Sequence, residues 1–236
     1  MALARYGGGI VQISGSIAGS VFARNRFGNY IRPRTKPVNP NSTRQEAART
    51  IVSFIAEYWH SEMTDVQRGL WNTYAAAVAM KNRLGETIHL TGFNHFIRSN
   101  AAVMGCGGGI DKPAPTILSL PEKDVVLQCT EEGIAAQTFT FTCDVAGWVP
   151  NLDPKSVITL YQGQPQLASR NFFGGPWRYM GIITAVEGAA GTATEPAAFS
   201  FALGQKVWFQ ARVITESRRV SELWTLDPRI IVADPP

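Results

Sequence analysis

The sequence predicts an α+β protein in which a small three-helix module precedes an all-β domain. Two changes of pattern predict this. Between residues 42 and 105, apolar residues recur at three- and four-residue spacing, which is typical of amphipathic helices. From residue 121 onward they alternate with polar residues, which is typical of strands with one buried face. Residues 1–41 show neither period and are rich in Gly, Pro and Arg.

Two capping-box patterns predict where the first two helices begin. We expect Thr43 to cap a helix that runs to about His60, with Glu46 reaching back, and Thr64 to cap the next helix together with Gln67. The join of about four residues makes the two helices antiparallel neighbours. The expected apolar faces are Ala47, Ile51, Ile55, Tyr58 and Trp59 in the first helix, and Val66, Leu70, Trp71, Tyr74 and Val78 in the second.

A third helix is expected from a cap at Thr91 to about Met104, after an extended stretch at 86–90. Phe93, Phe96, Ile97 and Met104 lie on one side of it. Glycines from Gly105 onward, followed by prolines, predict that this helix ends there. We therefore place a Gly- and Pro-rich linker at 106–120, between a helical module at 42–105 and a β domain at 121–236.

The β domain is predicted to hold seven short strands, a number typical of an immunoglobulin-like sandwich. The expected strands cover 125–129, 137–143, 156–161, 179–183, 198–201, 207–213 and 220–224. Thr and Phe alternate at 138–142, which indicates one wet face and one buried face. The segment 206–224, with its turn at 216–219, resembles the last hairpin of fibronectin type III domains. The resemblance implies a fibronectin III-like sandwich.

Charge is distributed unevenly along the chain, although the net charge is only +4. Residues 1–50 hold eight Lys and Arg against one acid, residues 51–105 balance at four and four, and residues 106–236 hold ten basic and thirteen acidic residues. A basic segment attracts nucleic acid or an acidic protein surface by the same long-range force, and charge alone does not choose between them.

Residues 1–41 are interpreted as an extended basic arm with a β-hairpin, in which 21–24 pair with 30–32 across the turn at 25–29. Three prolines hold 32–41 extended. A two-stranded hairpin cannot bury the apolar side chains of this arm, so we expect the arm to lie on a partner. The alternatives are a disordered tail and an arm wrapped over its own helices. The expected partner-binding residues are Phe22, Arg24, Arg26, Phe27, Tyr30, Arg32, Arg34 and Lys36.

No pattern in the chain predicts catalysis, so we expect a protein that is not an enzyme and has no catalytic residue, metal site or cofactor. His60, His89 and His95 lack metal-ligand spacing, and no nucleophile elbow or phosphate-binding loop occurs. The three cysteines (Cys106, Cys129, Cys143) are expected to be reduced and packed, with a Cys129–Cys143 bridge as the alternative.

The loop at 170–177 is the most suggestive surface of the β domain. One strand cannot bury both Phe172 and Phe173, so one of them is expected to meet a neighbouring subunit or a target, with Trp177 beside it. Trp148, Trp177 and Trp208 could form a sugar-binding face, although one large aromatic per strand is more often part of a core.

A DNA-binding helix-turn-helix is a further alternative for the helical module. The first helix carries only Arg44 and Arg49, and the second only Arg68, which is few basic groups for a recognition helix. We therefore expect that nucleic acid is not the partner.

The spacing of several residues over about 7–105 resembles a module found in virion-associated proteins of tailed phages and prophages. The matching positions are Arg32, Lys36, Pro37, Asn39, Pro40, Ser42, Gln45, Trp59, Thr64, Gln67, Arg68, Trp71, Tyr74, Ala75, Leu90, Thr91, Gly92, Phe96, Ile97 and Asn100. The resemblance transfers no catalytic residue.

What this resemblance implies is a structural component of a phage particle, made in the host cytoplasm and located in the virion. Its partners would be other virion proteins of the capsid or tail, and copies of itself. A capsid decoration or minor capsid protein is the leading expectation, and a tail or baseplate protein whose sandwich binds a host surface or glycan is the alternative. No apolar run is long enough to span a membrane.

Overall fold

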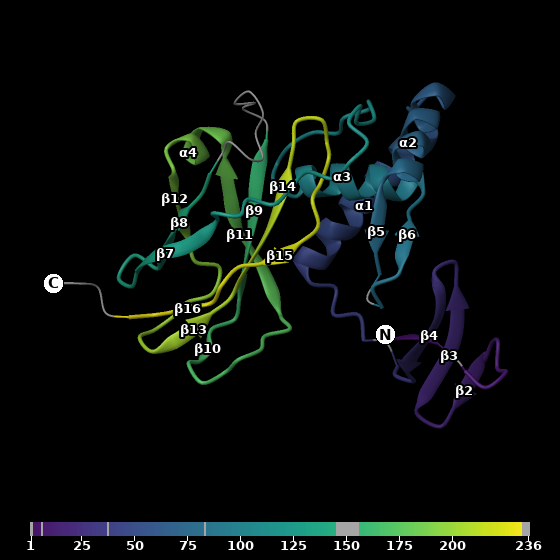
Figure 1. Ribbon diagram of the computed structural model, residues 1–236, viewed down its shortest axis with the longest axis horizontal. Coiled ribbons are helices and arrows are strands. Elements are labelled where there is room, and N and C mark those ends of the chain that lie inside the picture. Colours follow the sequence, from purple (N-terminus) through teal and green to yellow (C-terminus); the bar gives the residue numbers. More distant parts are fainter. Residues whose placement is uncertain (1, 6, 37, 83, 145–155, 233–236) are drawn as a thin grey trace.

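The computed structural model describes residues 2–5, 7–36, 38–82, 84–144 and 156–232 (Figure 1). The protein is a mixed α+β structure with an N-terminal sheet, a group of three helices and a pair of sandwich-like sheets. In Figure 1 the N-terminal sheet lies at the lower right, the helices above it and the sandwich-like sheets to the left. No helix in the described part of the chain is long and apolar enough to cross a membrane.

The N-terminal segment forms a four-stranded antiparallel sheet with the order β1-β4-β3-β2, rather than an extended arm with one hairpin. Its strands are β1 (Ala2–Ala4), β2 (Gly15–Ile17), β3 (Ser20–Asn25) and β4 (Gly28–Pro33). The expected hairpin is present, with Phe22 opposite Ile31. Sequence reasoning missed β1 and β2 because strands of three residues carry no readable alternation.

The helices are α1 (Thr43–Ser61), α2 (Asp65–Ala77) and α3 (Gly92–Met104), and a small hairpin of β5 (Ala79–Lys81) and β6 (Thr87–His89) joins the last two. The capping box at α2 is confirmed: the Thr64 hydroxyl accepts from the Gln67 amide at 3.3 Å, and the Gln67 side chain accepts from the Thr64 amide at 3.0 Å. Thr91 caps α3 as expected.

The predicted capping box at α1 is wrong. The N-cap is Ser42, whose side chain makes no capping hydrogen bond, and Thr43 is already helical. Because the helix starts one residue early, Glu46 occupies the fourth helical position and not the third, where it would reach the cap.

The apolar faces predicted for α1 and α2 are only half correct. Ile55 and Trp59 of α1 and Trp71 and Tyr74 of α2 are buried, whereas Val66 is 73% exposed. Leu70 and Ala47 are exposed as well. The buried residues of both helices lie in their C-terminal halves, where they meet α3. Within this core the Phe96 ring lies 5.2 Å from Trp59 and 5.4 Å from Trp71.

The segment at 106–120 packs against the helices along part of its length. The Trp71 indole donates to the Lys112 carbonyl at 3.0 Å, and the Asn100 side chain accepts from the Asp111 amide at 2.8 Å. Ile110 and Leu120 contact the helical core. This segment is therefore held in place by the helical module that precedes it.

The β domain contains a three-stranded sheet with the order β12-β8-β7 and a four-stranded sheet with the order β11-β9-β14-β15. A separate sheet of short strands, with the order β10-β13-β16, also belongs to the β domain. The strands are β7 (Gln128–Gly133), β8 (Thr138–Thr142), β9 (Val157–Gly163), β10 (Gln166–Leu167), β11 (Trp177–Thr184), β12 (Thr192–Pro196), β13 (Gln205–Val207), β14 (Phe209–Ile214), β15 (Trp224–Thr225) and β16 (Arg229–Ile230).

The two larger sheets bury one continuous core between them. Phe139 and Phe141 of β8 are fully buried, and the Phe209 ring of β14 lies 4.9 Å and 5.2 Å from them. Cys129 and Cys143 belong to this core and are free thiols, as is Cys106 outside it. Burial raises the pKa of Cys129 to about 12 and that of Cys143 to about 11, so both thiols stay protonated at neutral pH.

Several predicted strands are wrong in position. The Asp124 carboxylate accepts from the amides of Val126 and Leu127, which turns the chain, so β7 begins at Gln128 and not at 125. No strand forms at 198–201, and β12 lies earlier in the chain. The strand expected at 207–213 is divided at Trp208, and 220–224 pairs only at an isolated bridge and at β15.

A short helix, α4 (Ala185–Ala189), also went unpredicted, although it carries a complete capping box between Thr184 and Glu187.

Candidate functional site

The N-terminal sheet has no core. From Leu3 to Phe54, every residue whose burial is described is half-buried or exposed, and the first buried residue is Ile55. A sheet in a globular protein normally buries at least one face against another layer. This sheet is a single layer.

Apolar side chains stand on both faces of this sheet. Directly paired residues on antiparallel strands share a face, so Phe22 and Ile31 lie side by side on one face. Tyr30 pairs with Ala23 on one side and Leu3 on the other, which places these three on the opposite face. The sheet therefore presents an apolar row on each face.

The sheet is also strongly basic, and the cations predicted to bind a partner are all exposed. They are Arg24, Arg26, Arg32, Arg34 and Lys36. No Asp or Glu occurs before Glu46. The positive charges of the sheet can therefore be balanced only by acidic groups from outside this segment. The ion pair that links the sheet to the rest of the described chain joins Arg5 to Glu86 at 3.0 Å, with the Arg5 side chain 85% exposed.

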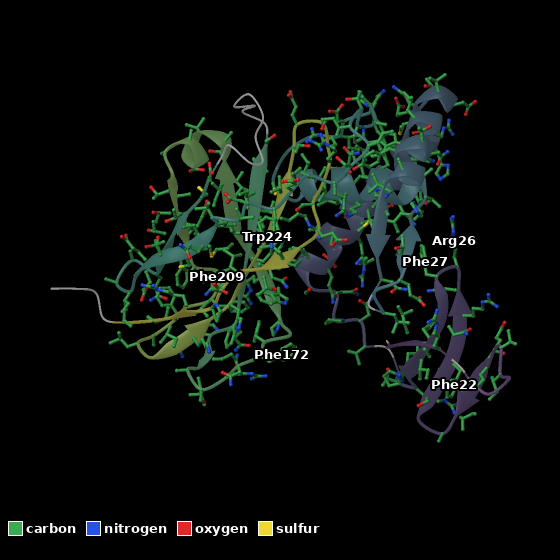
Figure 2. All side chains as sticks on the ribbon, viewed as in Figure 1. Phe22, Arg26, Phe27, Phe172, Phe209 and Trp224 are labelled. Carbon is green, nitrogen blue, oxygen red and sulfur yellow. The ribbon has the colours of Figure 1, made fainter. Side chains whose placement is uncertain are left out.

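The contact between the sheet and the helices is shallow. A hollow of about 460 Å³ is lined by Arg5, Arg26 and Phe27 on one side and by 86–89 on the other. Figure 2 shows Arg26 and Phe27 at the tip of the β3–β4 hairpin that points toward β5 and β6, with Phe22 farther away. Of the predicted partner-binding residues, Arg26 and Phe27 thus face the chain's own hairpin.

The loop at 170–177 exposes one of its two phenylalanines, as expected. Phe172 is 75% exposed, whereas Phe173 is buried. The Phe173 ring is stacked on Trp208 at 5.5 Å and lies edge-on to Trp177 at 5.0 Å. Gly163 makes room for it, because a Cβ there would lie 2.4 Å from the Phe173 ring.

The sugar-binding alternative loses one of its three tryptophans in this arrangement. Trp208 is 5% exposed and its indole is covered by Phe173. Trp177 is half-buried, and Trp148 lies outside the described residues. Of the aromatic residues of this loop, Phe172 is the exposed one.

Arginines join the helices to the sandwich. Arg98 of α3 donates to the carbonyls of Val220 and Ser221, the latter at 2.6 Å. From the turn before Val220, Arg219 donates to the Ser119 carbonyl, and Arg218 lies 3.5 Å from an Asp111 oxygen. Hydrogen bonds from charged guanidinium groups to backbone carbonyls are strong and directional, so they fix how the helices and the sandwich contact each other.

A buried polar cluster lies beside this junction, and sequence reasoning missed it. Tyr74, His95 and Ser99 are at most 1% exposed, and their side-chain polar atoms have no hydrogen-bond partner among the described residues. The His95 ring lies edge-on to Tyr74 at 5.2 Å. Burial, with Arg98 nearby, lowers the pKa of His95 to about 4, so the imidazole is neutral at pH 7.

A partial signal for this cluster was present in the sequence: His95 and Ser99 lie four positions apart, on the same side of the helix as the apolar Phe96 and Val103 that are buried with them. The other histidines lie apart from it, with His60 next to Phe93 and His89 on β6. Within the described residues, no three His, Cys, Asp or Glu side chains gather in a way that could hold a metal ion.

Comparisons with known proteins identify no family for this chain. No family model matches the sequence, and no curated protein matches it. Among solved structures, the twitchin kinase region from C. elegans is similar at a TM-score of 0.31 and 16% identity, over 49% of this chain and 17% of that chain. The chain thus spans about a sixth of the twitchin region's length, and a similarity of this size assigns neither fold nor function.

Proposed function

We propose that this chain is a non-enzymatic structural protein of a tailed bacteriophage particle, a capsid decoration or minor capsid protein that docks through its N-terminal sheet and helices. The observation that carries the proposal is the sheet without a core. Another molecule is needed to cover its two apolar faces.

The energetic reason is the exposed apolar surface of the sheet. Fully burying a side chain such as Phe22 or Ile31 stabilises a protein by about 1.5–3 kcal/mol, and neither is fully buried here. A sheet that leaves both apolar faces half open gains this free energy only by binding. The surrounding cations accelerate association with an acidic partner and favour it over other partners.

We further propose that the β domain is a fibronectin III-like sandwich that projects from the docked base. The support is its strand order, in which β7, β8 and β12 form one sheet and β11, β9, β14 and β15 form the facing one. The common core of Phe139, Phe141 and Phe209 shows that the two sheets are packed layers.

The test is assembly of the particle with an altered subunit. Deleting residues 1–40 is expected to abolish incorporation into phage particles, because the docking surface is lost, while the remaining chain keeps its far-UV circular dichroism. Replacing Leu203, an apolar residue 58% exposed on the sandwich, with Ser is the matched control and should incorporate normally. Normal incorporation of the deletion variant would refute the proposal.

A tail or baseplate protein is the second candidate, and the exposure of Phe172 favours it. In that case the sandwich would bind a host surface or glycan through the loop at 170–177. Phe172→Ala is then expected to reduce adsorption of particles to the host while leaving incorporation unchanged. For a capsid decoration protein, the same variant changes neither quantity.

A DNA-binding accessory protein is the remaining alternative, and the structure weakens its helix-based form. Arg49 of α1 is occupied by the side chains of Asn39 and Asn41, and Arg68 of α2 by the Met63 carbonyl. Duplex DNA binding that falls steeply with salt would favour this alternative over the structural role.

A further inference from the structure

We propose that the N-terminal sheet of one copy binds a groove at the edge of the sandwich of a second copy, so that copies join head to tail. This inference rests on the proposed function, since it names one partner for a sheet that needs one. It identifies the acceptor by shape, by open backbone and by charge.

The acceptor is a groove between the segments 120–127 and 221–227, here called the edge groove. Two adjoining hollows, of about 310 and 210 Å³, form it and share Lys123 and Trp224 in their walls. Leu120, Pro121, Leu223 and Trp224 line the larger hollow, whereas the smaller one is mainly polar and includes Lys123, Thr225 and Asp227. Val125 is 83% exposed and Leu223 is 44% exposed, so apolar surface lies open along the groove.

The edge groove runs along an open sheet edge. β15 is the last strand of its sheet and pairs with β14 alone. A strand edge with unpaired backbone groups can accept another strand. The donor offers a matching edge, because β2 pairs with β3 alone and Ile17 at its end is 64% exposed.

Charge at the two surfaces is complementary. Glu122, Glu222 and Asp227 are exposed around the edge groove, against one cation, Lys123. The donor sheet with its loops and the segment that follows it carry six exposed cations and no acid (Arg5, Arg24, Arg26, Arg32, Arg34 and Lys36). Opposite charges on partner surfaces raise the association rate and disfavour wrong pairings.

Two other ways of covering the sheet are less favourable. Stacking two copies of the sheet on each other would bring like charges together, which costs free energy. The N-terminal sheet does not dock on the edge groove of its own chain. In Figure 1 the helices lie between this sheet and β15, and in Figure 2 Phe22 and Trp224 are far apart. Donor and acceptor therefore belong to different copies.

A contact between unlike surfaces of identical chains is heterologous, so each copy can bind one neighbour at each end. Such contacts close into a ring or continue as a filament. Repeated copies of a virion protein arranged in this way would cover a particle or encircle its axis.

The experiment uses the full-length chain and sedimentation velocity at increasing protein concentration. The donor variant is Arg24→Glu with Arg32→Glu, and the acceptor variant is Glu122→Lys with Asp227→Lys. We expect the unaltered chain to associate and each variant to do so at least about tenfold more weakly, because like charges then face each other. The control is Glu131→Lys, an exposed acid on β7 outside the groove, which should associate like the unaltered chain.

Mixing the two variants decides between this contact and any other. The mixture pairs reversed donors with reversed acceptors and intact donors with intact acceptors, so association should return to the strength of the unaltered chain. Far-UV circular dichroism checks that each variant is folded. A monomer at every concentration, association unaffected by the acceptor variant, or no recovery in the mixture would each overturn the head-to-tail contact. Loss of particle incorporation on deleting residues 1–40, seen together with a monomeric chain, would leave the proposed function standing and remove only this inference.

Discussion

The N-terminal sheet and the sandwich are both antiparallel and both carry phenylalanines on their strands, yet the sandwich has a core and the N-terminal sheet has none. In the sandwich, Phe139 and Phe209 come from facing sheets and meet in the interior with no exposure. In the N-terminal sheet, Phe22 and Ile31 pair on one face with no second layer against them. Strand pairing alone does not bury side chains, because burial needs a second layer packed against the sheet.

The largest expected effect contrasts two phenylalanines, both labelled in Figure 2. Phe209→Ala should lower the free energy of unfolding by about 3–5 kcal/mol, because it leaves a cavity between the two sheets. Phe22→Ala should lower it by less than about 1 kcal/mol in the isolated chain, because the side chain is not fully buried. Urea unfolding measures both values, and equal losses would mean that the N-terminal sheet has a core after all.

The next largest effect is a dependence of stability on pH that arises from His95 in the helical core. The N-terminal sheet has no histidine and cannot contribute such an effect. The pKa of His95 is about 4 in the folded protein against 6.5 for an ordinary histidine. Between these two pH values the unfolded chain binds a proton that the folded protein does not. Stability should therefore fall by about 3 kcal/mol as the pH drops from 6.5 to 4, and change no further from this group below pH 4.

The check for His95 is urea unfolding across that pH window with two variants. His95→Phe should keep most of the stability at pH 7, because neither ring nitrogen has a partner among the described residues, and should flatten the pH dependence. His89→Asn, on the exposed β6 strand, should leave the slope as it was. An unchanged slope in His95→Phe would contradict the assignment.

A smaller effect separates the two attachments to the helices. Arg98→Met should cost about 2 kcal/mol, since it removes charged hydrogen bonds to the carbonyls of Val220 and Ser221. Arg5→Met should change stability little, because its pair with Glu86 is exposed and screened. Chemical unfolding of both variants tests this, and a similar loss in both would mean that the N-terminal sheet is attached as firmly as the sandwich.

The smallest effect concerns the two helix starts. Thr64→Ala should cost about 1 kcal/mol through loss of the capping hydrogen bond, whereas Ser42→Ala should cost almost nothing because Ser42 makes none. Thermal unfolding of the two variants checks this pair. A loss on Ser42→Ala equal to that on Thr64→Ala would show that Ser42 also caps its helix in solution.

Sequence reasoning succeeded where the signal was local. The caps at Thr64 and Thr91 depend on residues three positions away, and both are confirmed. The strand β8 was found because Thr and Phe alternate over five residues with one face buried. It failed where a neighbouring element decides which residues are buried: Val66 fits the apolar period of α2 as well as Trp71 does, yet it is 73% exposed, and the buried residues of α2 begin at Trp71.

The candidate surfaces show the same division. The sequence already showed that the first forty residues are basic and partly apolar. It also showed that one strand cannot bury both Phe172 and Phe173. The edge groove was not readable in the sequence, because it joins segments about a hundred residues apart in the chain. For the buried cluster at His95, the sequence offered only the spacing of His95 and Ser99, because the Tyr74 ring that packs on His95 comes from α2.

Local patterns in the chain were enough to predict the order of the parts, the starts of α2 and α3, and the difference in charge between the N-terminal sheet and the sandwich. These depend on composition and on interactions within a few residues. The tertiary structure decided which apolar residues are buried, where strands such as β12 pair, and which edge of the sandwich stays open. The physical reason is that burial and pairing are set by the layer on the other side, and that layer comes from a distant part of the chain.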